Sequence, residues 1–182
     1  MRIVAGAFKG RSLTAPSGTE TRPTADRVRQ ALFDILLHAP WAGRSIIENA
    51  TILDLFAGTG ALGLEALSRG AARAMFVERS RPALAALNAN IAACRCEDRC
   101  TVLNIDAMAI PAGPPAGIVF LDPPYARNLV PLALARLRTV GRLGPDSLIV
   151  AETGRGEPSP ETDPLSERTH GAARITIWRN GA

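Results

Sequence analysis

The sequence predicts an α/β fold with a doubly wound, mostly parallel sheet, a C-terminal antiparallel hairpin and a small N-terminal extension. Segments with strand and helix periodicity alternate from residue 51 to residue 152. A glycine-rich turn joins the first of these strands to a helix, as in nucleotide-binding α/β sheets. The chain has 182 residues, of which 47% are hydrophobic, so it can bury a core without disulfides.

The N-terminal extension is expected to be a hairpin followed by a helix. Residues 2–5 and 11–14 are separated by two glycines and predict a small hairpin. Residues 16–23 are expected to form a loop, and residues 24–37 a helix that packs on the sheet. The apolar residues of this helix recur at helical spacing, namely Val28, Ala31, Leu32, Ile35 and Leu36.

A loop over residues 38–50 leads to the alternating segments. Strands are expected at 51–56, 74–78, 100–105, 117–121 and 147–152, and helices at 61–69, 81–92 and 129–139. A Gly/Pro-rich loop follows, and residues 165–169 and 174–178 predict the closing hairpin. We therefore divide the chain into an extension over residues 1–40 and a main domain over residues 41–182.

The glycine turn predicts a nucleotide cofactor. Gly58 and Gly60 permit positive φ and let a ligand approach the backbone. With Gly63 they also match the dinucleotide fingerprint, so their spacing alone does not separate NAD from S-adenosylmethionine. Asp54 favours S-adenosylmethionine, because a carboxylate four residues before the first glycine could hold the ammonium group of this methyl donor.

Three further residues complete the predicted cofactor site. Glu78 ends a predicted strand, where it would accept hydrogen bonds from both ribose hydroxyls. Asp106 follows the next strand, where it could bind the adenine amine or, alternatively, cap a short turn. Phe56, at the end of the first strand, is the third residue predicted to contact the cofactor.

Asp122-Pro123-Pro124-Tyr125 follows an apolar strand and predicts methyl transfer to an exocyclic amine. The amine of a nucleobase is a poor nucleophile, so its lone pair must be aimed at the methyl donor. Asp122 and the carbonyl of Pro123 could accept its two hydrogens, because two prolines make a stiff turn without competing N–H groups. Tyr125 would stack on the extruded base. This motif has no role in hydride transfer, which also argues against a dehydrogenase.

Positive charge is concentrated at the N-terminus. Residues 1–30 hold six basic and two acidic side chains, a net +4 that equals the charge of the whole chain. A basic segment on a neutral body suggests contact with the phosphates of a nucleic acid. The candidate contacts are Arg11, Arg22, Arg27 and Arg29, and the alternative is a solvated surface with a few ion pairs.

Composition excludes several other classes. Cys94, Cys96 and Cys100 have no histidine nearby, so we expect ordinary thiols and no metal. No apolar stretch is long enough to cross a bilayer, and basic residues follow Met1 too soon for a signal sequence. We therefore expect a cytoplasmic monomer that binds no membrane.

Together, these motifs resemble the RsmD family of bacterial enzymes. The resemblance covers the first residues, the segments 22–33 and 53–66, and Asp122-Pro123-Pro124-Tyr125. It implies a Rossmann-like methyltransferase that uses S-adenosylmethionine and methylates guanine N2 in 16S ribosomal RNA, within the small subunit or its precursor. It also implies an N-terminal extension, whose positive charge suggests contact with this RNA or the ribosome.

Other functions share parts of this pattern. Enzymes that methylate DNA, for example at adenine N6, or protein glutamine would share the glycine turn and the Asp-Pro-Pro motif. A protein that binds RNA without catalysis would need neither the acids nor the glycines. The arginine-rich N-terminal motif favours the RNA enzyme over these alternatives.

Overall fold

The structure is a computed structural model that describes residues 1–16, 23–124 and 128–181. Its strands are β1 (Thr51–Asp54), β2 (Arg73–Glu78), β3 (Cys100–Asn104), β4 (Ala116–Leu121), β5 (Leu143–Gly154), β6 (Ser166–His170) and β7 (Ala173–Arg179). Its α-helices are α1 (Pro23–His38), α2 (Arg44–Ile47), α3 (Ala61–Ser68), α4 (Arg81–Cys94) and α5 (Leu129–Thr139). Two short 3-10 helices, η1 (Glu97–Arg99) and η2 (Ala107–Ala109), flank β3.

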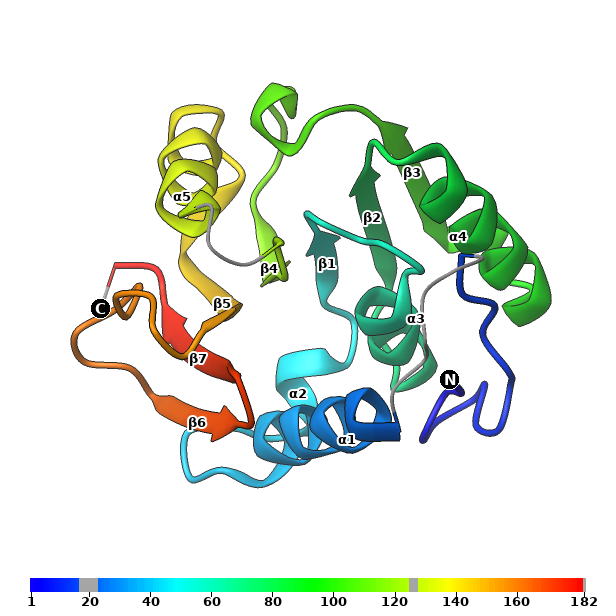
Figure 1. The fold of residues 1–182 in the computed structure, drawn as a ribbon, viewed down its shortest axis with the longest axis horizontal. Helices are drawn as coiled ribbons and strands as arrows, with labels where there is room; N and C mark the ends of the chain where they lie inside the picture. The colour runs from blue at the N-terminus through cyan, green and yellow to red at the C-terminus, as the bar shows by residue number, and fades with distance from the viewer. Residues whose placement is uncertain (17–22, 125–127, 182) are drawn as a thin grey trace.

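The strands form one sheet in the order β3-β2-β1-β4-β5-β7-β6 (Figure 1). The first five strands of this order run parallel, whereas β7 is antiparallel to both β5 and β6. The predicted fold class is therefore confirmed, including the closing hairpin. None of the helices in the described part of the chain is long and apolar enough to span a membrane.

The sheet has an apolar core on each face. On one face, α1, α3, α4 and the N-terminal segment pack on residues such as Phe76, Phe120 and Val150. On the other face, α5 and η2 cover residues such as Val119 and Ile149. Burial of these two faces holds both layers of helices on the sheet, because apolar area removed from water stabilises the fold.

Helix α1 starts at Pro23, one residue before the predicted start, and ends at His38. Leu32 and Leu36 are buried as expected, while Val28 and Ile35 are half-buried. Phe33 is also fully buried, although the predicted apolar face did not include it. Its ring lies 6.0 Å from that of Phe120, so it widens the contact between α1 and the sheet.

The segment over residues 38–50 differs from the prediction, because it contains the short helix α2 and is not only a loop. Strand β5 also starts earlier than expected, at Leu143. The sheet accommodates Gly144 and Pro145 in an irregular stretch. Its register with β4 shifts between the pairs Ala116–Leu143 and Ile118–Leu148.

Residues 1–14, which we term the N-terminal arm, lie against α3 and α4 (Figure 1). The expected hairpin is present over a short stretch: Arg2 and Ser12 form an antiparallel bridge, and the amides of Ile3 and Leu13 donate to the carbonyls of Arg11 and Met1. The arm also bonds to other elements. Glu65 of α3, which is fully buried, accepts hydrogen bonds from the amides of Val4 at 2.8 Å and Ala5 at 3.1 Å.

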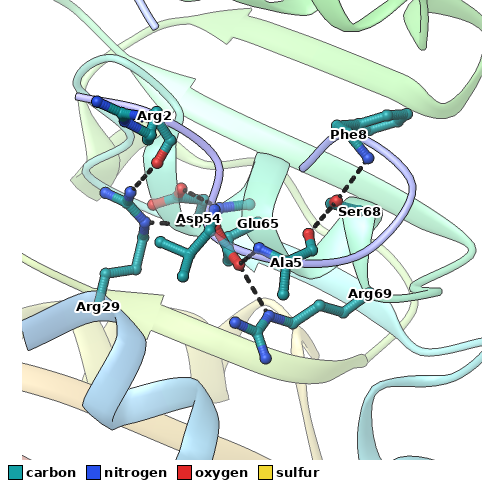
Figure 2. Close-up of polar contacts among 10 residues, drawn as sticks. Arg2, Ala5, Phe8, Arg29, Asp54, Glu65, Ser68 and Arg69 are labelled. Atoms are coloured by element: carbon teal, nitrogen blue, oxygen red, sulfur yellow. Dashed lines mark hydrogen bonds and ion pairs between the residues drawn. The ribbon is translucent and has the colours of Figure 1, made fainter. Parts of the chain in front are cut away.

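Buried polar groups therefore fix the arm to α3 (Figure 2). Ser68 accepts a hydrogen bond from the amide of Phe8 at 2.9 Å and donates one to the carbonyl of Ala5. Arg69 pairs with Glu65 at 2.8 Å. Gly6 has a φ of +81°, and a Cβ there would meet the backbone of Ser68, so only glycine suits this close approach.

Candidate active site

A cavity of about 950 Å³ opens near the carboxyl ends of β1, β2, β4 and β5. Ligands bind at this place in open α/β sheets, where the strand order reverses. Each of these strands contributes one carboxylate near its end: Asp54, Glu78, Asp122 and Glu152. The volume suffices for a nucleotide-sized cofactor and part of a second ligand.

The glycine turn forms one wall of the cavity. Gly58 has a φ of +53° and open space where a Cβ would lie, so a ligand can approach its backbone. Gly60 has a φ of +78°, and a Cβ there would lie 2.4 Å from the side chain of Leu87. Phe56, half-buried before the turn, lines the same wall.

Asp54 lies at the base of the cavity and is 2% exposed. Its carboxylate accepts a hydrogen bond from the amide of Gly63 at 3.1 Å. Burial raises the pKa of Asp54 to about 7, the hydrogen bond from Gly63 opposes this shift, and the negative charge of Glu78 adds to it. A cationic ligand group would relieve the cost of the buried charge.

Glu78 fixes the shape of the site around the end of β2. One oxygen of its carboxylate accepts a hydrogen bond from the amide of Gly58 at 2.8 Å. The other accepts hydrogen bonds from the amides of Arg79 and Ser80, at 2.8 and 2.7 Å. A carboxylate has about four acceptor sites, so these bonds leave capacity for a ribose hydroxyl.

Asp106 caps a short helix, as in the alternative that the sequence left open for this residue. Its carboxylate accepts a hydrogen bond from the amide of Met108 at 2.8 Å, at the start of η2. The second oxygen pairs with Arg79 at 2.6 Å. Both side chains line the cavity, so this cap holds Asp106 at the place where the adenine contact is predicted.

Asp122 and the two prolines follow β4 directly and line the same cavity as the glycine turn, which follows the neighbouring strand β1. The Asp122 side chain is exposed and lines the cavity. Desolvation by the protein atoms packed around its carboxyl group raises the pKa of Asp122 to about 8, and the negative charges of Glu152 and Asp54 add to the shift. Tyr125, the predicted stacking residue, lies outside the described residues.

The predicted RNA-contacting arginines have different surroundings. Arg27 is exposed and lines a surface groove with Arg2 and Lys9, while Arg11 is exposed and bonds to the carbonyl of Ala93. Arg22 lies outside the described residues.

Arg29 is buried, contrary to the prediction of a phosphate contact. It is 4% exposed, pairs with Glu65 at 3.5 Å and bonds to the carbonyl of Arg2 (Figure 2). This burial argues against the predicted phosphate contact and favours a structural role, in which Arg29 ties α1 to the arm. The sequence could not separate the two roles, because arginines on one helix differ in burial only after packing.

Sequence analysis did not identify Glu152 or His170 as cavity residues. Glu152 follows the apolar run Leu148–Ala151, the same pattern that marked Asp54 and Asp122, so the signal for it was present. His170 is the last residue of β6, and no local pattern shows that this end of the β6–β7 hairpin reaches the cavity.

The cavity suits a positively charged methyl donor. In the described part of the chain, five carboxylates line it against the guanidinium groups of Arg29 and Arg79. S-adenosylmethionine carries a sulfonium and an ammonium group, and the open backbone at Gly58 leaves room beside the acids. The residues present therefore fit this cofactor.

The sheet, the glycine turn and the acids define the class of protein, a Rossmann-like, S-adenosylmethionine-dependent methyltransferase. A family model described as "Conserved hypothetical protein 95" matches residues 1–179. The chain belongs to this family, which confirms the resemblance to the RsmD family.

Individual relatives agree with this assignment. The chain is 42% identical to "Ribosomal RNA small subunit methyltransferase D" of Escherichia coli (strain K12), over 84% of this chain and 74% of the relative. It is 36% identical to "Putative rRNA methyltransferase YlbH" of Bacillus subtilis (strain 168), over 98% of each. The solved structure of the "Putative methyltransferase yhhF" of Escherichia coli superposes with a TM-score of 0.83, at 38% identity, and covers 99% of this chain and 97% of that one.

Proposed function

We propose that this protein transfers a methyl group from S-adenosylmethionine to N2 of a guanine in small-subunit ribosomal RNA, at position 966 of 16S rRNA. The observation that carries the proposal is that Asp122 and the glycine turn face one cavity. The names of the relatives support ribosomal RNA as the acceptor. The choice of N2 and of this position rests on the family resemblance.

The cofactor site is formed by Asp54, Phe56, Gly58, Gly60, Glu78 and Asp106. When bound, S-adenosylmethionine supplies an electrophilic methyl group. Asp54 holds a cationic group at the base of the cavity, and Glu78 keeps the backbone of Gly58 in place while accepting from the ribose. Asp54 is shielded from bulk water, which strengthens its contact with a cation.

Asp122 and the carbonyl of Pro123 hold the two hydrogens of the guanine amine and so direct its lone pair. Pro124 keeps the turn rigid, and Tyr125 stacks on the extruded base. Methylation makes the amine more acidic, and its proton passes to the carboxylate of Asp122. The pKa of Asp122 is raised to about 8 in the free protein, and the positive charge of the bound donor favours the carboxylate form that holds the amine and accepts this proton.

The RNA backbone is contacted by the exposed cations of the arm and of α1. Arg2, Lys9 and Arg27 line one groove, and their spacing on a single surface suits phosphate contacts. Arg11 and Arg22 extend this set. The extension over residues 1–40 thus serves the substrate, and the domain over residues 41–182 serves the chemistry; the enzyme acts as a monomer on the small subunit or its precursor.

The test is a methylation assay with tritium-labelled S-adenosylmethionine and small ribosomal subunits that lack the modification. The RNA is digested to nucleosides, and the labelled nucleoside is identified by chromatography. Label in N2-methylguanosine supports the proposal. Label in another nucleoside contradicts the acceptor atom, and the absence of label with subunits, while DNA or protein is labelled, contradicts the substrate class.

A further inference from the structure

Glu152 lies beside Asp122 in the cavity. Strands β4 and β5 run parallel, and Leu121 pairs with Ala151 in their register. The next residue along each strand direction is a carboxylate, Asp122 on one and Glu152 on the other. Both line the cavity, and the charge of Glu152 is felt at Asp122.

Glu152 also lies on the face of the sheet from which Asp54 projects. The register aligns Asp54 with Phe120 and Phe120 with Val150. Side chains two residues apart on a strand share a face, so Glu152 follows Val150 on this side. The half-buried Glu152 thus adds a second carboxylate next to Asp122, and neither the proposed cofactor contacts nor the proposed methyl transfer uses it.

Two neighbouring carboxylates inside a cavity repel each other, and a ligand that donates hydrogen bonds to both would offset this cost. The nucleobases differ in what they offer. Guanine presents N1–H next to its N2 amine, which makes two adjacent donors. Adenine and cytosine present an amine next to a ring nitrogen that is an acceptor, so a second carboxylate would repel them.

We propose that Glu152 is a specificity-determining residue, whose carboxylate accepts the N1–H of the guanine while Asp122 holds the N2 amine. This inference rests on the proposed function and adds to it the physical basis of base selection. Discrimination comes from the N1 position, because an acceptor at N1 would face a carboxylate with no proton between them.

The test uses small subunits assembled with RNA in which the target guanine is replaced by 2-aminopurine. This base keeps the N2 amine but has an acceptor at N1. The wild-type enzyme is expected to prefer guanine by about 100-fold in kcat/KM, since a buried polar mismatch is costly. Comparable kcat/KM values of the wild-type enzyme on the two bases would by themselves overturn the inference.

Glu152→Gln provides the second arm of the test, because its amide can donate a hydrogen bond to the N1 acceptor. The variant is expected to shift the guanine to 2-aminopurine ratio toward 2-aminopurine by at least about tenfold. The absence of O6 from 2-aminopurine is the same for both enzymes, so the change in the ratio reports on N1.

The control is Glu48→Gln, the same change at an exposed glutamate after α2 that does not line the cavity. It should leave the ratio unchanged. An unchanged ratio in Glu152→Gln would contradict the inference. Failure of the wild-type enzyme to label guanine N2 at all would instead contradict the proposed function, so the two failures are distinguishable.

Discussion

Asp122 gives the most direct test of the chemistry. Replacing it with alanine removes an acceptor for the amine, while the proposed cofactor contacts are unaltered. We expect kcat to fall by about 1000-fold or more, because orientation of a weak nucleophile supplies much of the rate. Affinity for S-adenosylmethionine, measured by isothermal titration calorimetry, should change by less than about threefold. A variant that kept most of its kcat would contradict the assigned role.

Because the pKa of Asp54 lies near neutrality, we expect the affinity for the cofactor to depend on pH. Its pKa of about 7 in the free protein means that the carboxyl group is increasingly protonated below neutral pH. Only the carboxylate attracts an ammonium group, so the Kd should rise as pH falls below about 7, by up to tenfold per pH unit. Calorimetry at about pH 6.5 in buffers of different ionisation enthalpy should detect proton release on binding.

Asp54→Asn is the control for this prediction. It removes the titrating group while keeping an acceptor for the amide of Gly63. Affinity should be weak and nearly independent of pH in the same range. If the wild-type Kd were constant between about pH 6 and 8, Asp54 would not be the partner of the ammonium group.

The acids of the site were predictable to the extent that each follows an apolar run. Asp54, Glu78 and Asp122 were identified in this way, because the carboxyl ends of parallel strands meet at one edge. Glu152 follows a similar run but belongs to no familiar motif. Arg29 was assigned the wrong role, because its positive charge is evident from the sequence whereas its burial is known only from the structure.

Helix α3 anchors the N-terminal arm through Glu65, so this helix and the arm should lose stability together. Glu65→Ala would leave two arm amides and the guanidinium of Arg69 without their buried acceptor. Breaking such a buried network typically costs about 3–5 kcal/mol. Urea denaturation should show this loss. Glu48→Ala, at an exposed position, should change the free energy of unfolding by less than about 0.5 kcal/mol.

Limited proteolysis separates release of the arm from global unfolding. The arm contains Lys9 and Arg11, both exposed, and trypsin should cleave it faster in Glu65→Ala than in the wild type. Wild-type-like denaturation and cleavage in this variant would show that the arm is held by its apolar contacts, Ile3, Phe8 and Leu13, and not by Glu65.

Helix α4 links the arm to the cofactor turn through Asn90, which is 1% exposed. Its amide group bonds to the carbonyls of Thr14 at 3.0 Å and Thr59 at 2.9 Å, and its oxygen accepts from the amide of Thr14. Asn90→Ala should raise the KM for S-adenosylmethionine by about tenfold with a smaller effect on kcat, because Thr59 is no longer positioned.

The matched control is Asn88→Ala, since Asn88 lies on the same helix but is exposed. It should leave KM within about twofold of the wild-type value. Equal effects of the two substitutions would assign the change to α4 as a whole and not to the bond with Thr59.

The parts of the fold that could be predicted are those with a local sequence pattern. Periodicity indicated α1, α3, α4 and α5, because one face of each packs on the sheet. The hairpin of the arm was predicted, but its two sides pair only over a short stretch, and Glu65 and Ser68 accept hydrogen bonds from other arm amides. Contacts between residues about 60 positions apart carry no local signature.

The chain as a whole combines a basic surface with an acidic cavity. The net charge of +4 comes from the first 30 residues, whereas carboxylates outnumber cations in the described lining of the cavity. This charge distribution attracts phosphates to the arm and disfavours their entry into the cavity. The cavity therefore favours the cationic donor and an uncharged base. The two regions therefore divide the ligands by charge.

Crowded carboxylates also predict how stability depends on pH. The pKa values of Asp54 and Asp122 rise from 3.8 to about 7 and about 8 on folding. The folded protein thus binds more protons than the unfolded chain between about pH 4 and 8, so its stability is greatest in the lower part of this range and falls as pH rises through 7 and 8. Asp54 alone contributes a loss of about 1.4 kcal/mol between pH 6 and 8.

The expected observation is a lower unfolding midpoint in urea at pH 8.5 than at pH 6.5 for the cofactor-free protein. The double variant Asp54→Asn with Asp122→Asn should lose most of this dependence, because neither position can then ionise. Saturating S-adenosylmethionine should stabilise the wild type more at pH 8.5 than at pH 6.5, since its positive charge offsets the ionised carboxylates. A wild-type midpoint that rises with pH over this interval would mean that these two acids ionise without penalty, and the electrostatic account of the cavity would then be wrong.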